Sequence, residues 1–156
     1  MFETHRQLMT NGLTSQDPKL RYLAFKCWAL CCISIESLAE QSSTKLFMLA
    51  LGREKEEKIQ RIIFQALFDC FLLFELPSSG QLFNCLCEHF ANKAVSSYSI
   101  KTRQLLTLGF CKCYATGKCQ DSLVLGQLIL KCSSELFEPA KSIRDLIRRF
   151  FDWYVF

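Results

Sequence analysis

The sequence is poor in histidine and lacks the short motifs that many catalytic and phosphate-binding sites need. Only two of its 156 residues are histidines, His5 and His89, and neither stands in a recognisable motif. Because nucleophilic catalysis needs a base beside a serine or cysteine, the sequence gives no support for a catalytic triad. Neither GxxxxGK[ST] nor GxGxxG occurs, which excludes a phosphate site built on a glycine loop. We therefore predict that the protein is not an enzyme and needs no cofactor.

Long uncharged runs and targeting signals are also missing. The longest stretch without a charged residue is the twelve residues from Leu76 to Cys87, whereas a membrane-spanning helix needs about 20 apolar residues. The first residues, MFETHRQLM, contain no basic segment that leads into an apolar run and no small-residue cleavage site. We expect an intracellular protein without a membrane-spanning helix.

Cysteine is plentiful, at ten residues, but the CxxC pairs of zinc and redox sites are absent. Most of the cysteines fall on helical apolar stripes, where a free thiol packs as a small hydrophobic group. Cys85 and Cys87, like Cys111 and Cys113, are two residues apart and point to opposed sides of their helices. We predict packed, reduced thiols and no metal site. A cluster of His89 with Cys85 or Cys87 stays open as an alternative to a histidine on the helix surface.

The sequence does contain one helical pattern that occurs four times. The pair Asp17-Pro18 predicts a helix start, because the carboxylate accepts from free amides and proline presets the backbone. From there, apolar positions recur at i, i+4, i+7 and i+11, and the pattern returns after 39 (59 − 20), 43 (102 − 59) and 41 (143 − 102) residues. The four stripes are Leu20, Ala24, Cys27, Cys31; Ile59, Ile63, Ala66, Cys70; Thr102, Leu106, Gly109, Cys113; and Ile143, Ile147, Phe150, Tyr154. The residues after the four origins are Arg21, Gln60, Arg103 and Arg144.

A period of about 40 residues built from helix pairs is typical of HEAT and armadillo arrays, in which each unit buries its apolar face against its neighbours. We therefore predict an all-α, HEAT/armadillo-like α-solenoid, forming a single array over residues 1–156 that belongs to a longer solenoid. Its four helical hairpins are expected at about 2–34, 36–75, 81–116 and 119–155. The sequence requires no strand.

Several details of the helices can be predicted in advance. Glu54, Glu56 and Glu57 should open the helix of residues 54–75 as a solvated first turn that complements the positive helix start. Leu38, Leu46, Leu49 and Ala50 supply the apolar positions of helix 36–51, and Leu125, Leu128, Ile129 and Cys132 face inward in helix 121–132. Gly109 and Gly126 lie inside helices, where glycine costs about 1 kcal/mol relative to alanine, so we expect neighbouring helices to approach them closely.

The net charge of +4 comes entirely from the second half of the chain. Between Lys93 and Lys131 there are six basic residues and one acidic residue, Asp121. A surface of this kind can bind a phosphate backbone through counterion release. An ordinary solvated face is the competing interpretation.

Five segments carry a resemblance to a known family. LAFKCWALCCISIESLAEQ, KLFMLAL, IIFQALFDCFLLF, LGFCKCYATGKCQDSLVLGQLIL and RDLIRRFFDWYVF resemble the HEAT-repeat core of the condensin G subunit, also called chromosome-associated protein G, of the Cnd3 family. The resemblance extends from Asp17 to Tyr154. It implies a non-catalytic scaffold that binds the kleisin subunit and, through it, the ATP-hydrolysing SMC subunits. It also implies a contribution to binding duplex DNA in mitotic chromosome condensation, and a location in the nucleus, on mitotic chromosomes and in the cytoplasm.

Family members are several times longer, so we expect this chain to be a fragment or a reduced relative. The recognised residues are buried ones, so candidates for DNA or partner contacts must come from their chemistry. These candidates are Lys101, Arg103, Lys112, Lys118, Arg144, Arg148 and Arg149. Arg103 and Arg144 occupy the repeat position where arginine also serves packing between repeats, and both roles stay open. A HEAT adaptor that binds a protein ligand and no nucleic acid is the alternative function.

Overall fold

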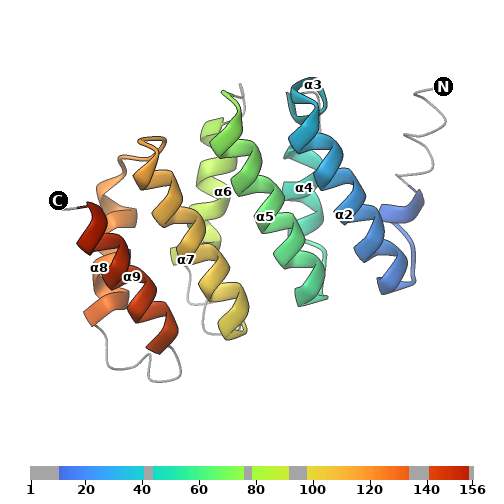
Figure 1. The fold of residues 1–156 in the computed structure, drawn as a ribbon. Coiled ribbons are helices and arrows are strands. Elements are labelled where there is room, and N and C mark those ends of the chain that lie inside the picture. Colours follow the sequence, from blue (N-terminus) through green and yellow to red (C-terminus); the bar gives the residue numbers. More distant parts are fainter. Residues whose placement is uncertain (1–10, 41–43, 76–78, 92–97, 134–140, 155–156) are drawn as a thin grey trace. The chain divides into compact units, whose positions relative to one another are not determined.

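The computed structural model describes residues 11–40, 44–75, 79–91, 98–133 and 141–154, and every regular element in these ranges is a helix (Figure 1). The elements are α2 (Pro18–Ser34), α3 (Glu36–Leu38), α4 (Thr44–Leu51), α5 (Glu57–Leu73), α6 (Ser79–Ala91), α7 (Ile100–Ala115), α8 (Ser122–Ser133) and α9 (Lys141–Tyr154). The prediction of an all-α helical-repeat fold is thereby confirmed. Most of the helix expected at 2–12, and the helix start expected at Pro139, lie outside the described residues.

The chain divides into two compact units, Met1–Leu82 and Phe83–Phe156. A single array over residues 1–156 therefore stays a prediction. None of the helices in the described ranges is long and apolar enough to span a membrane.

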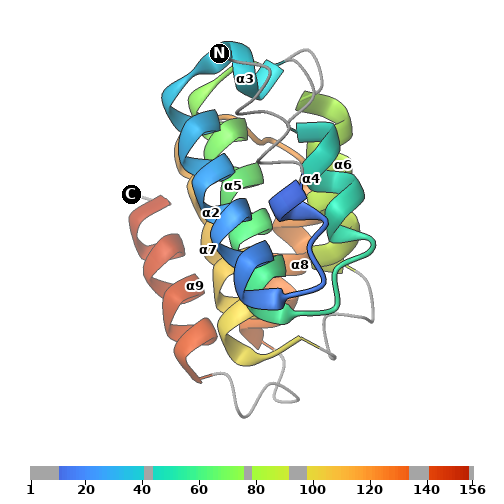
Figure 2. The same ribbon diagram turned by 90° about the vertical axis from the view of Figure 1, so that its right-hand side faces the viewer.

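In the first unit, α2 and α5 lie side by side and run in the same direction, and α4 packs against α5 (Figures 1 and 2). The predicted start of α2 is confirmed, because the Asp17 carboxylate accepts a hydrogen bond from the amide of Lys19 at 2.9 Å and Pro18 is the first helical residue. The rings of Phe25 in α2 and Phe47 in α4 lie 6.2 Å apart. The second hairpin therefore covers one side of α2.

The predicted stripe is right for α5 and wrong in part for α2. All four stripe residues of α5 are buried: Ile59, Ile63, Ala66 and Cys70. Of the four stripe residues of α2 only Ala24 is buried, whereas Leu20 is 49% exposed and Cys27 is exposed as well. The other buried residues of α2 are Phe25, Ala29 and Cys32. Because α2 carries apolar residues on every side, its sequence periodicity could not identify the side that packs on α4 and α5.

In the second unit, α7 and α9 lie side by side, and α8 packs against α9. Phe110 of α7 sits between two rings of α6, with centroid distances of 6.0 Å to Phe83 and 4.6 Å to Phe90. The predicted stripes are confirmed by the burial of Thr102, Leu106, Gly109 and Cys113 in α7 and of Ile143, Ile147 and Phe150 in α9. The side chain of Tyr154 is outside the described part of the chain.

The connection between α7 and α8 follows the predicted helix stop at Gly117. This glycine has φ +71°, a left-handed conformation that favours glycine and ends a helix. Asp121 then starts α8, since its carboxylate accepts from the amide of Leu123 at 2.7 Å. Its carbonyl oxygen accepts a hydrogen bond from the hydroxyl of Tyr114, which fixes the loop against α7.

Several smaller predictions need correction. Within the helix expected at 36–51 the structure gives α3 and α4, and residues 41–43 lie outside the described part. Ser79 and Gly80 belong to α6 rather than to a loop. Leu49 and Ile129 were expected to supply apolar positions facing inward, but they are 65% and 49% exposed. Phe47 and Val124 are buried in their helices instead. In a short helix with many apolar residues, a shift of one or two positions is enough to select another face.

The two glycines inside helices have different environments. Gly109 is buried in α7, and a close helix approach there stays a prediction. Gly126 in α8 does not meet the prediction, because a Cβ atom built there would have no atom of the described residues within 4 Å outside the adjacent backbone of its own helix.

We expect Gly109→Leu to lower the free energy of unfolding by about 1 to 3 kcal/mol, because it overfills a close-packed contact. Gly126→Ala is the matched control and should be neutral or stabilising by up to about 1 kcal/mol, since alanine is the better helix former and its methyl group enters open space. Thermal unfolding followed by circular dichroism measures both. An unchanged melting temperature for Gly109→Leu would refute the repeat register.

Candidate functional site

A groove of about 290 Å³ lies between α2 and α5 in the first unit. Its apolar lining comes from both helices, and one cationic and one anionic side chain line it as well. The lining includes Tyr22, Lys26, Leu30 and Ile33 of α2 with Ile62 and Asp69 of α5. Leu30 is 58% exposed, so the groove offers apolar surface to a partner. An apolar groove with fixed charges suits a short peptide segment better than a phosphate backbone.

A partly buried ion pair connects α2 to the residues just before α5. Nε of Arg21 lies 3.0 Å from Oε2 of Glu54, and Nη2 lies 3.2 Å from Oε1. Nη1 of Arg21 also donates to the carbonyl oxygens of Ser15 and Gln16 at 2.9 and 3.1 Å. The Glu54 side chain is only 7% exposed. Because the guanidinium plane matches the two carboxylate oxygens, this pair fixes the second hairpin on the first.

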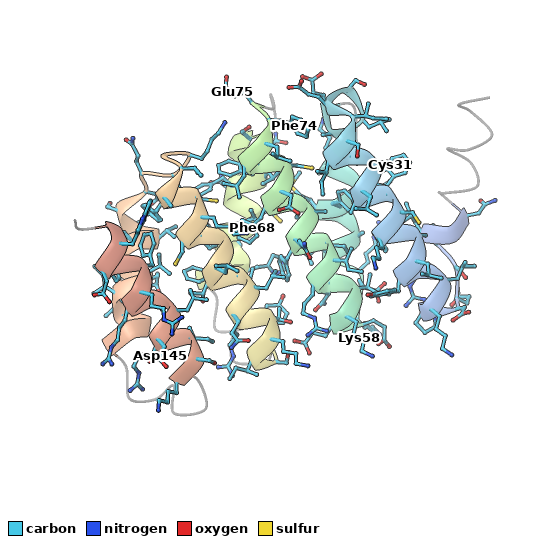
Figure 3. The ribbon with its side chains drawn as sticks, in the orientation of Figure 1. Cys31, Lys58, Phe68, Phe74, Glu75 and Asp145 are labelled. Carbon is cyan, nitrogen blue, oxygen red and sulfur yellow. The ribbon has the colours of Figure 1, made fainter. Side chains whose placement is uncertain are left out.

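This pair corrects the prediction that Glu54 belongs to a solvated first turn. α5 begins at Glu57, and Oε1 of Glu54 accepts from the amides of Lys55 and Glu56, each at 2.9 Å. Burial raises the pKa of the Glu54 carboxyl, but the hydrogen bond from Arg21 and those two amides outweigh burial and lower the pKa overall. Glu54 therefore remains ionised and holds the start of α5. Figure 3 shows Lys58 at this end of α5 and Glu75 beyond the other end.

The seven basic candidates all lie in the second unit, but they do not form one cluster. Lys101 and Lys112 are exposed on the same side of α7, since eleven residues amount to about three helical turns. Lys118 is exposed in the loop after α7, and Arg148 and Arg149 are exposed on α9. The structure therefore offers separate basic positions along two neighbouring helices. Lys93 and the side chain of Lys131 lie outside the described part.

Arg103 and Arg144 differ from the other five candidates, because both side chains are half-buried. They occupy the repeat position of Arg21, which directly follows the origin of the stripe. In Arg144 the Nε atom is buried and has no hydrogen-bond partner in the described part of the chain. Their burial makes both arginines poorer candidates for phosphate contacts than the exposed lysines.

Charge reversal of Arg148 and Arg149 to glutamate should leave folding intact, because both side chains are exposed. We expect a change in the free energy of unfolding of no more than about 0.5 kcal/mol for each substitution. Soluble yield and the midpoint of urea unfolding measure this. A collapse of the soluble yield would contradict the placement of both side chains on the surface.

The cysteines and His89 show no arrangement for catalysis or metal binding in the described residues. No three cysteine, histidine or acidic side chains there are placed to hold a metal ion, and the cysteines described are thiols rather than disulfides. Burial raises the pKa of the Cys87 and Cys113 thiols to about 12. His89 is half-buried rather than on the surface, and its Nδ1 lies 2.8 Å from the Tyr98 hydroxyl. Since burial also lowers the pKa of His89 and raises that of Cys85, a thiolate paired with an imidazolium is disfavoured.

Comparison with known proteins gives one match. A family model described as "Nuclear condensing complex subunits, C-term domain", with the short name Cnd3, matches residues 3–156. No curated protein and no solved structure matches the chain.

Proposed function

The chain belongs to the Cnd3 family of nuclear condensing complex subunits, and on this basis we propose that it is a scaffold that binds the kleisin subunit of condensin and contributes to DNA binding. Its role as a condensin subunit comes with the family, whose members are non-catalytic scaffolds. The observation that carries the proposal is the family match over nearly the whole chain. SMC subunits would be bound through kleisin.

We assign the kleisin contact to the groove between α2 and α5. An extended or helical kleisin segment could place apolar side chains on Leu30, Ile33 and Ile62, with Lys26 and Asp69 fixing its direction. The groove lies in the first unit and has both signs of charge, whereas the excess of positive charge lies in the second half of the chain. Protein and DNA contacts would therefore use different units.

We assign the DNA contact to exposed cations of the second unit: Lys101, Lys112, Lys118 and Arg149. Because Lys101 and Lys112 lie about 16 Å apart on one side of α7, they can contact separate phosphates of one duplex. Such contacts carry no sequence information. Binding should therefore be weak and independent of sequence, which suits a protein that acts along whole chromosomes in mitosis.

The salt dependence of binding to a labelled DNA duplex tests this assignment. Phosphate contacts give a slope of log K against log salt near −0.9 for each phosphate neutralised. We expect the variant with Lys101→Gln and Lys112→Gln to have a slope smaller by about 2 units. Lys19→Gln, an exposed lysine in the first unit, is the control and should not change the slope. No measurable binding to DNA at low salt would remove the DNA part of the proposal.

A HEAT-type adaptor for a protein ligand without any nucleic-acid role is the second candidate. The groove between α2 and α5 favours it, because its lining combines apolar side chains with one cation and one anion rather than the cluster of cations that a phosphate backbone needs. Binding of a kleisin peptide without binding of DNA would select a condensin subunit whose role is confined to protein contacts. If the chain binds neither a kleisin peptide nor DNA, a general HEAT-type protein adaptor is the remaining candidate function. Under the main proposal the protein is found in the nucleus, on mitotic chromosomes and in the cytoplasm, and needs neither a membrane nor a small-molecule substrate.

A further inference from the structure

The Arg21–Glu54 pair shows how the second hairpin docks on the first. Arg21 directly follows the stripe origin Leu20, and Glu54 precedes the next origin, Ile59, by five residues (59 − 54). The arginine lies on the second helix of one hairpin, and the carboxylate lies in the connection inside the following hairpin. The following hairpin is therefore recognised by a carboxylate at a fixed place.

The same side of α2 is covered by apolar contacts with the following hairpin. Phe25, five residues after the origin, is 2% exposed and contacts Phe47 of α4. Cys32, twelve residues after the origin, is completely buried. The docking side of α2 thus combines one paired guanidinium with a buried apolar strip.

The side of α9 that corresponds to the docking side of α2 carries different residues. Arg144 directly follows the origin Ile143, as Arg21 follows Leu20, and its half-buried side chain has a buried Nε with no hydrogen-bond partner among the described residues. Arg148 stands five residues after the origin, where α2 has Phe25, and it is exposed. Phe151 is half-buried on the same side, seven residues after Arg144. This side of α9 therefore carries two cations, one of which has a donor without a partner among the described residues.

The contact with α7 occupies a different side of α9. Nε2 of Gln104 in α7 donates to the hydroxyl of Ser142 at 2.7 Å. Ser142 and Arg144 are two residues apart, about 200° around the helix. The Arg144 side of α9 therefore points away from the contact between Gln104 and Ser142.

We propose that Arg144, Arg148 and Phe151 form a docking surface for a helical protein segment with a carboxylate at the position that Glu54 has relative to α5. The carboxylate would pair with the accessible part of the Arg144 guanidinium, and the helix would cover Phe151. A second carboxylate on the occupant would face Arg148, which is exposed on the same side of α9. A half-buried guanidinium beside an aromatic ring suits a protein carboxylate better than a phosphate of duplex DNA.

A second copy of this chain stacked head to tail does not fit the surface. The position five residues before Leu20 is Ser15 (20 − 5), which has no carboxylate. The nearest acid, Asp17, is engaged in capping α2. The occupant is therefore a different acidic helical segment.

A peptide of residues 52–75 is the probe, because it contains Glu54 and the helix that docks on α2. A hydrocarbon staple between positions 58 and 65, both exposed in α5, holds it helical. The labelled peptide is titrated with the full chain by fluorescence anisotropy. We expect saturable binding that weakens at least about tenfold when Glu54→Gln is made in the peptide or Arg144→Gln in the chain. The two changes together should cost little more than either alone. Lys141→Gln, on the first residue of α9, is the control and should leave binding unchanged.

Three outcomes would overturn the proposal: no saturable binding of the stapled peptide, equal binding of the peptide with Glu54→Gln, or no effect of Arg144→Gln in a folded chain. If the chain with Arg144→Gln fails to fold, the proposal is tested by comparing the binding of the stapled peptide and of its Glu54→Gln version to the unaltered chain. Duplex DNA is titrated in parallel. If Arg144→Gln and Arg148→Gln weaken DNA binding as much as Arg149→Gln does, the surface binds phosphate and the assignment to an acidic protein segment is wrong.

Discussion

Phe110→Ala is expected to lower the free energy of unfolding by about 3 to 5 kcal/mol, the largest effect of any single substitution considered. Phe110 is completely buried, and its ring contacts those of Phe83 and Phe90. Alanine would leave a cavity where α6 and α7 meet and would remove both ring contacts, each of which is worth about 0.5 to 1.5 kcal/mol beyond the area it buries. The second unit of the variant should therefore unfold at a lower urea concentration than the first unit.

Urea unfolding followed by circular dichroism measures this change. Leu123→Ala in α8 is the matched control, because Leu123 is 79% exposed and its truncation should cost no more than about 0.5 kcal/mol. Equal effects of the two substitutions would mean that α6 does not pack on α7 through Phe110.

Glu54→Gln is expected to lower the free energy of unfolding by about 2 to 3 kcal/mol at pH 7, because it leaves the Arg21 guanidinium without its anionic partner. Glutamine keeps the size of the side chain, so the loss reports the ion pair rather than packing. At 156 residues this corresponds to a fall in melting temperature of about 5 to 10 °C. Glu57→Gln, on the first residue of α5, is the control for charge in this segment.

The pH dependence gives a second test of the same pair. The folded protein lowers the pKa of Glu54 below its ordinary value of 4.5. The carboxylate therefore contributes its full stabilisation above pH 4.5, and this contribution is lost as the pH falls through the lower pKa of the folded state. The difference in stability between the wild type and Glu54→Gln should shrink over that acidic range. A difference that is constant down to about pH 3 would contradict the lowered pKa.

The sequence predicts the helices best where a helix has neighbours on more than one side. In α5 the apolar stripe coincides with the buried face, because α2 and α4 both pack against this helix. The start of α2 at Asp17 was also predictable, since capping depends on adjacent residues. The buried face of α2 could not be predicted, because apolar residues surround this helix and the following hairpin decides which side is covered.

The candidate site was less predictable for a related reason. Arg21 and Glu54 are 33 residues apart, and no local pattern distinguishes their buried pair from a solvated charge. The groove between α2 and α5 likewise depends on how two helices lie together. One signal was available, because Tyr22, Leu30 and Ile33 are apolar residues off the predicted stripe of α2. The exposed lysines of α7 were identified from the sequence, but the partial burial of Arg103 and Arg144 required the structure.

Affinity capture with the tagged full chain from an extract of dividing cells tests the central claim most directly. The retained proteins are identified after washing at moderate salt, and circular dichroism shows that the tagged chain is helical. Membership of the Cnd3 family predicts that the condensin kleisin subunit and the SMC subunits are recovered together. Recovery should fall when Leu30 and Ile33 in the groove are replaced by aspartate. A folded, helical chain that retains neither kleisin nor SMC subunits would contradict the proposed role in condensin.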